Sequence, residues 1–170
     1  MAQKSSQQIV SDYFALQKRV TEQSVAKLTR IKNKAPKNLD NLVHALHNEV
    51  FEKIDCLDCA NCCKTLGPGV KDTDITRLAK HLKMRPSDVV QQYFTMDSDG
   101  DYIFNSMPCP FLMPDNYCMV YEARPRACRE YPHTDRRRFE QLTRITKENL
   151  KVCPAVFLII EGLKIKDYQI

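Results

Sequence analysis

Four cysteines stand within eight residues of this chain of 170 residues, at Cys56, Cys59, Cys62 and Cys63. Gaps of two residues let a turning backbone aim successive sulfur atoms at one metal centre, as in zinc sites. The first three also match the spacing of the opening ligands of a bacterial ferredoxin-type loop. That loop's usual last element, a cysteine followed by proline, is missing, and Cys63 directly follows Cys62 instead. The run therefore predicts a metal centre built on an irregular loop.

Adjacent cysteines tend to point their side chains apart and seldom serve one metal ion together. We therefore expect Cys62 and Cys63 to serve two different centres, unless one of them is not a ligand. Eight thiolates suffice for two four-ligand sites, or for one cluster with a structural zinc or a thiol pair. We predict that all eight cysteines are metal ligands: Cys56, Cys59, Cys62, Cys63, Cys109, Cys118, Cys128 and Cys153.

The later cysteines lie in stiff contexts. Cys109 lies between Pro108 and Pro110, and Cys153 precedes Pro154. Proline fixes the local backbone and removes N–H groups that would compete for partners, which suits a ligand held in place. These contexts favour metal ligation over scattered buried thiols.

A four-thiolate centre carries negative charge, and arginines lie around Cys128 in the sequence. Positive side chains can offset that charge, donate hydrogen bonds and tune a redox potential. We predict this supporting role for four residues: Arg124, Arg126, Arg129 and Tyr131. The alternative is surface ion pairing of the arginines with Glu122 and Glu130, which stabilises little. His133 is a minor ligand candidate.

A disulfide framework is the main alternative to metal, but eight cysteines allow 105 pairings. The N-terminal residues Met-Ala-Gln-Lys-Ser-Ser lack the apolar region of a signal peptide. The longest apolar run, Ala155 to Ile160, is far shorter than the roughly 20 residues that span a bilayer. We therefore expect a cytoplasmic protein with no membrane contact, in a compartment that keeps thiols reduced.

The apolar periodicity predicts a mainly α fold with a small irregular α+β cysteine-rich metal centre that contains two short hairpins. An N-terminal helical pair, residues 1–54, should pack on the core, and residues 55–170 should form the metal-binding domain. Asp72 or Thr73, and Ser87, are the expected N-caps of two short helices. The expected helices cover residues 6–33, 39–54, 72–83, 86–94, 138–149 and 154–163, and the hairpins turn at Asp99-Gly100 and at Pro114-Asp115-Asn116.

The net charge of +5 permits an anionic partner but does not require one. Residues 88–93 would form the second helix of a helix-turn-helix pair, yet they include no Lys or Arg to contact phosphate or bases. We therefore do not expect nucleic-acid binding. A protein partner stays open, and the sequence does not determine the oligomeric state.

Three blocks of sequence, together spanning about residues 56–154, carry a resemblance to a known family. They are the run Cys56 to Cys63, the segment Cys109-Pro110-Phe111-Leu112, and the segment Tyr117 to Pro132 with Cys153-Pro154 after it. The chain resembles the YkgJ-type cysteine cluster proteins, also called the CxxCxxCC zinc- or iron-chelating domain. The resemblance implies metal chelation and says little about a biochemical role.

Three functional hypotheses follow. The favoured one is a protein that carries an iron–sulfur cluster, of the 4Fe–4S type, in a redox, cluster-handling or sensing role. The second is a zinc-stabilised module for protein or nucleic-acid interaction, whose metal folds a core that short elements cannot bury alone. The third is a metal-dependent enzyme of unknown substrate, with Arg124, Arg129, Tyr131 and His133 beside the metal. The sequence shows no catalytic pair that would decide for or against catalysis.

Overall fold

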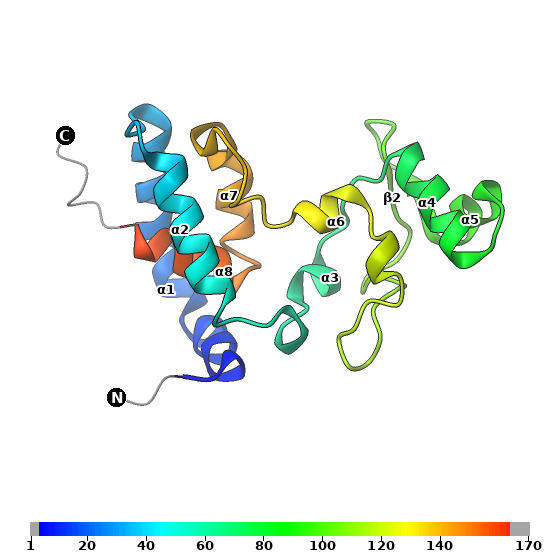
Figure 1. Ribbon diagram of the computed structural model, residues 1–170, viewed down its shortest axis with the longest axis horizontal. Coiled ribbons are helices and arrows are strands. Elements are labelled where there is room, and N and C mark those ends of the chain that lie inside the picture. The colour runs from blue at the N-terminus through cyan, green and yellow to red at the C-terminus, as the bar shows by residue number, and fades with distance from the viewer. Residues whose placement is uncertain (1–3, 164–170) are drawn as a thin grey trace. The chain divides into compact units, whose positions relative to one another are not determined.

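The computed structural model describes residues 4–163, apart from the side chains of residues 16–21. The described chain is mainly helical with one two-stranded antiparallel sheet (Figure 1), which confirms the predicted fold class. It divides into two compact units. Unit 1 combines the residues up to Cys59 with those from Pro132 onward, and unit 2 comprises Ala60–Tyr131.

Unit 1 is built on the long helix α1, Ser6–Asn33, and on α2, Leu39–Phe51. The Ser5 hydroxyl caps α1 by accepting a hydrogen bond of 3.2 Å from the Gln8 N–H. The remaining elements of unit 1 are the 3-10 helices η1, Cys56–Asp58, and η3, Phe139–Leu142, and the helices α7, Thr143–Asn149, and α8, Pro154–Gly162.

Helix α8 completes the core of unit 1. Pro154 occupies its first turn, where the missing N–H costs nothing. Both α1 and α2 pack against α8, which Figure 1 shows in red beside them. The predicted division places α8 in the domain of residues 55–170 with the N-terminal helical pair packed on it, and α8 shares an apolar core with α1 and α2. No helix within residues 4–163 is both long and apolar enough to cross a membrane.

Replacing Ile159 by alanine should lower the free energy of unfolding of unit 1 by about 2–5 kcal/mol, because the Ile159 side chain is fully buried in this core. Urea denaturation followed by circular dichroism measures the change. Ile145 on α7 is 41% exposed, so Ile145→Ala is the matched control and should change stability by less than about 0.5 kcal/mol. Equal effects of the two substitutions would contradict this packing.

Unit 2 has a separate apolar core under its helices and hairpin. In the hairpin, Phe94 pairs with Phe104, and Gly100 supplies the left-handed turn residue at a φ of 80°. The elements are α3, Asn61–Thr65; α4, Asp72–Leu82; α5, Pro86–Tyr93; β1, Phe94–Met96; β2, Tyr102–Phe104; the 3-10 helix η2, Tyr121–Ala123; and α6, Arg126–Glu130.

The second hairpin of unit 2 consists of one bridge, between Leu112 and Cys118. Its turn contains Asn116 at a φ of 65°, and the Met113 N–H donates to the Tyr117 carbonyl at 2.8 Å. Both predicted hairpin turns are therefore present. The Met119 N–H donates to the Phe111 carbonyl at 2.9 Å on the other side of Cys118.

Several helix boundaries differ from those predicted. Helix α7 begins at Thr143 and not at 138, because Arg138 takes a left-handed φ of 59°. The Asp40 carboxylate accepts hydrogen bonds from the N–H groups of Arg138 and Phe139, which fixes that bend. The expected caps are also displaced: Lys71 precedes α4 and Arg85 precedes α5, each in extended backbone.

Candidate metal centres

Five free thiols lie in unit 2, each partly buried: Cys62, Cys63, Cys109, Cys118 and Cys128. Cys62 and Cys63 are consecutive residues of α3, which starts after Ala60 in the left-handed conformation. Their sulfur atoms are 3.9 Å apart, so the two side chains do not point apart as the sequence suggests. Two thiolates on one zinc ion lie about 3.8 Å apart, given a Zn–S bond of about 2.3 Å.

A backbone hydrogen bond joins Cys109 to this pair, and Cys118 and Cys128 lie on the hairpin and the helix that follow Cys109 in unit 2. The Cys109 N–H donates to the Cys63 carbonyl at 2.8 Å, which joins the proline-flanked turn to α3. The Cys118 carbonyl accepts from the Tyr121 N–H at 3.1 Å as the hairpin leads into η2. Cys128 lies in the middle of α6, which starts after the buried Pro125. Segments far apart in the sequence thus contribute to one group of thiols.

Burial keeps most of these thiols protonated. Burial raises the pKa of Cys109 to about 11 and that of Cys128 to about 12, and it also raises the pKa of Cys118. Negative charge on Cys63 raises all three further. The four sulfur atoms therefore lie within electrostatic reach of one another, and a cation that replaces their protons would remove this penalty.

Cys63 differs from its neighbours. A hydrogen bond with the Cys62 thiol lowers the pKa of Cys63 to about 7, and the positive charges of Arg124 and Lys64 add to the effect against the opposing effect of burial. Thiolates, and not thiols, are the metal ligands. The lowered pKa makes the thiolate form of Cys63 more accessible than that of Cys109, Cys118 or Cys128.

Unit 1 holds a second group of thiols, Cys56, Cys59 and Cys153. The first two lie at the ends of the turn η1, whose Cys59 N–H donates to the Cys56 carbonyl at 3.1 Å. The Asp55 carboxylate caps that turn, and the Asp55 N–H donates to the Ser6 hydroxyl at the start of α1. The turn is thus attached to the helical core of unit 1.

Cys153 reaches the same group from the other end of the chain. Its N–H donates to the Asn149 carbonyl at 2.8 Å, which places it just before α8. Burial raises the pKa of Cys153 to about 12, and negative charges on Cys56 and Cys59 raise it further. The structure therefore brings Cys153 near two cysteines that lie more than ninety residues earlier in the sequence.

The chemistry of both groups suits a soft metal, since their donors are thiols and soft thiolates select zinc, copper(I) and iron–sulfur clusters. Within residues 4–163, no three Cys, His, Asp or Glu side chains already stand at the spacing of a metal site. Metal binding would therefore draw the thiols of each unit together.

Two of the predicted supporting residues, Arg124 and Arg126, have different contacts in the structure. The Arg124 guanidinium lies 3.4 Å from the centre of the Tyr121 ring. Its charge helps to lower the pKa of Cys63 and opposes the rise in the pKa of Cys118 and Cys128. The Arg126 side chain forms an ion pair with Glu130 at 2.5 Å, which is the alternative weighed for the arginines. The charge of Arg124 acts on the ionisation of the unit 2 thiols, and its role beside a metal stays a prediction.

Three other predicted residues have less defined places. Arg129 is exposed on α6, and Tyr131 is half-buried at the end of that helix. His133 belongs to unit 1 and takes a left-handed φ of 68°. Their roles near a metal stay predictions.

Two residues that hold the backbone between the unit 2 cysteines were missed in the sequence: Asp74 and Arg77. Asp74 is buried on α4 and accepts a hydrogen bond from the backbone N–H of Arg126, two residues before Cys128. The sequence did hold a signal for this pair: Asp74 lies in the first turn of a helix and Arg77 follows three residues later. That spacing places two side chains together on a helix.

A comparison with known families identifies the chain. Residues 55–154, more than half of its length, match the family model described as "CxxCxxCC: Putative zinc- or iron-chelating domain". No curated protein and no solved structure matches the chain. The matched range begins just before Cys56 and ends just after Cys153, so it contains both groups of thiols. The chain is a metal-binding protein and belongs to the CxxCxxCC family of zinc- or iron-chelating domains.

Proposed function

We propose that this chain carries an iron–sulfur cluster and acts in electron transfer, cluster handling or redox sensing. The observation that carries the proposal is the grouping of thiols in unit 2, where the Cys62 and Cys63 sulfur atoms lie 3.9 Å apart and the Cys109 N–H donates to the Cys63 carbonyl. The charges of Cys63, Cys109 and Cys118 also act on the ionisation of Cys128. Four thiolates are the ligand set of a 4Fe–4S cluster. The positive charge of Arg124 beside them would offset the negative charge of such a cluster.

The thiols of unit 1 support a second centre. Cys56, Cys59 and Cys153 come together from both ends of the matched domain, and burial disfavours the charged form of Cys153. A bound metal would stabilise that thiolate. The role of Cys62 as a metal ligand stays a prediction.

We also propose that the chain resides in a reducing compartment such as the cytoplasm. All eight cysteines are free thiols in the structure, and thiolate centres require that state. Disulfide formation would remove the ligands.

Zinc is the second candidate, because four thiolates also form a tetrahedral structural zinc site. The segment between Cys109 and Cys128 favours a zinc site, because its regular structure consists of short elements and one isolated bridge. A structural metal would supply the folding free energy that such elements lack.

Anaerobic purification followed by iron, sulfide and zinc analysis distinguishes the two candidates. An iron–sulfur protein should be brown, contain iron and sulfide in equal amounts, and give an electron paramagnetic resonance signal on reduction or oxidation. A colourless protein with zinc and no sulfide, after growth in iron-supplied medium, would support the zinc module. A chain with none of these would contradict both.

Replacing Arg124 by glutamine should lower the reduction potential of the cluster by on the order of 50 mV, close to a tenfold change for one electron. The added electron is less stable once the nearby positive charge is removed, because Arg124 acts on three of the thiols. A spectroelectrochemical titration measures the shift. Arg85 pairs with Asp88 on α5 of the same unit, so Arg85→Gln is the matched control and should leave the potential unchanged.

A further inference from the structure

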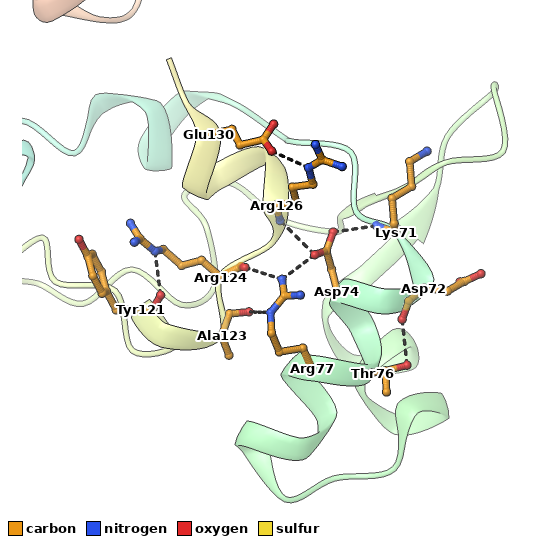
Figure 2. A network of polar contacts seen from close by, with 10 residues as sticks. All are labelled: Lys71, Asp72, Asp74, Thr76, Arg77, Tyr121, Ala123, Arg124, Arg126 and Glu130. Atoms are coloured by element: carbon orange, nitrogen blue, oxygen red, sulfur yellow. Dashed lines mark hydrogen bonds and ion pairs between the residues drawn. The ribbon is translucent and has the colours of Figure 1, made fainter. Parts of the chain in front are cut away.

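Asp74 is a buried carboxylate in unit 2 with three hydrogen-bond donors around it (Figure 2). Its residue is 2% exposed. It accepts hydrogen bonds from the Arg77 guanidinium at 2.5 Å, from the Lys71 N–H at 3.2 Å and from the Arg126 N–H at 3.0 Å. Arg77 lies on α4, Lys71 is the N-cap of α4, and Arg126 is the first residue of α6. The carboxylate therefore joins two helices.

Arg77 extends the same network to the chain just before α6. Its Nε donates to the Ala123 carbonyl at 3.3 Å, and its Nη2 donates to the Arg124 carbonyl at 2.6 Å. Figure 2 shows the guanidinium between these two carbonyls and the Asp74 carboxylate. Segment 123–126 is thus attached to α4 at both of its ends, through two carbonyls and one N–H.

This segment lies between two of the unit 2 thiols and carries the arginine that acts on them. Cys118 precedes it by five residues, and Cys128 follows Arg126 by two. The Arg124 carbonyl faces Arg77, while the Arg124 Nε donates to the Tyr121 carbonyl at 2.8 Å. The backbone contacts of Arg77 therefore fix where the Arg124 side chain starts, and the contact of Asp74 fixes where α6 starts.

The network is sensitive to the loss of either charged partner. Burial raises the pKa of Asp74, but the hydrogen bonds from Arg77, Lys71 and Arg126 outweigh it and leave the pKa below its usual value. The carboxylate is therefore charged at neutral pH. Removing one partner of a buried pair leaves the other charge uncompensated and frees the groups that it held.

We propose that Asp74 and Arg77 are positioning residues for the thiolate centre of unit 2. They hold segment 123–126 so that Cys128 and the Arg124 charge stay directed toward the other thiols. The inference rests on the proposed metal centre. It assigns a role to two residues that are not themselves metal ligands, since both act through the backbone.

Anaerobic titration with Co²⁺ tests the proposal, because cobalt bound by thiolates absorbs in the near ultraviolet and visible. The fraction of the signal that Cys128→Ser removes defines the unit 2 centre. Asp74→Asn and Arg77→Lys should weaken Co²⁺ binding at that centre by about 10–100-fold, the usual effect of losing a group that orients ligands. The visible bands should also change shape, because the ligand geometry is altered.

Two controls separate positioning from general destabilisation. Asp88→Asn removes an exposed carboxylate paired with Arg85 in the same unit and should leave binding unchanged. Val89→Ala weakens the core of unit 2 at a fully buried position on α5 and removes none of the hydrogen bonds of Asp74 and Arg77. It should lower thermal stability and leave the shape of the cobalt bands unchanged.

The outcomes distinguish this inference from the proposed centre. The positioning role is wrong if Asp74→Asn and Arg77→Lys bind Co²⁺ with an affinity within twofold of the wild type and with unaltered visible bands. An equal loss of affinity in Val89→Ala would also overturn it. Should Asp74→Asn fail to fold, Arg77→Lys, which keeps the positive charge but loses the planar fork, decides the question. No cobalt binding by the wild-type chain would instead refute the proposed centre.

Discussion

Replacing Cys128 by serine should abolish metal binding in unit 2 and leave the metal of unit 1 in place. Cys128 is the cysteine that α6 supplies, and negative charges on Cys63, Cys109 and Cys118 raise its pKa. A serine hydroxyl neither ionises at neutral pH nor matches thiolate affinity for zinc or iron. The loss should exceed the roughly 10–100-fold that follows changes to groups which only orient ligands. Metal analysis of the purified variant measures it.

The matched control is Cys153→Ser. Cys153 belongs to unit 1 and is coupled to Cys56 and Cys59, so this variant should lose the metal of unit 1 and keep that of unit 2. Loss of all metal in both variants would contradict two separate centres. Full metal content in both variants would show that neither cysteine is a ligand.

Removing the metal should open the backbone between Cys109 and Cys128 while the α4 helix stays folded. Amide hydrogen exchange of Met113 and Met119 should accelerate on the order of 100-fold or more, because a bound metal contributes several kcal/mol to the folding of such a segment. These amides lie in a hairpin that has one bridge and is anchored in the core by Phe111. Exchange measured by mass spectrometry with and without a chelator tests the effect.

The amides of Leu78 and Ala79 on α4 are the internal control. Both residues are buried in the core of unit 2 and lie outside the cysteine segments, so their exchange should change less than about tenfold. Equal protection of the Met113 and Met119 amides with and without metal would contradict a role for the metal in ordering this hairpin.

The elements with strong local signals could be predicted from the sequence. The apolar period of residues 6–33 matches α1 at both ends, and the Asp99-Gly100 and Pro114–Asn116 turns are where the sequence places them. Helix α6 was missed, because five residues are too few for a periodic pattern. The bend before α7 was missed because it depends on Asp40, about a hundred residues earlier.

The grouping of the candidate ligands could not be predicted, because it depends on contacts between distant segments. Spacing identifies the run from Cys56 to Cys63 as metal-binding, but it does not show that Cys153 joins Cys56 and Cys59. It also suggests divergent side chains for Cys62 and Cys63, whose sulfur atoms lie 3.9 Å apart in the structure. The network of Asp74 and Arg77 is equally non-local, since its partners lie 46 to 52 residues away.

The central claim is that the cysteines of both units bind metal as thiolates. Native mass spectrometry of the anaerobically purified chain, followed by thiol alkylation under the same conditions, tests it most directly. We predict that the mass exceeds that of the polypeptide by the mass of two metal centres. The thiols that affect one another's ionisation in each unit should resist alkylation until a chelator is added: Cys56, Cys59, Cys63, Cys109, Cys118, Cys128 and Cys153. The mass of the polypeptide alone, with all eight cysteines alkylated at once, would contradict the account.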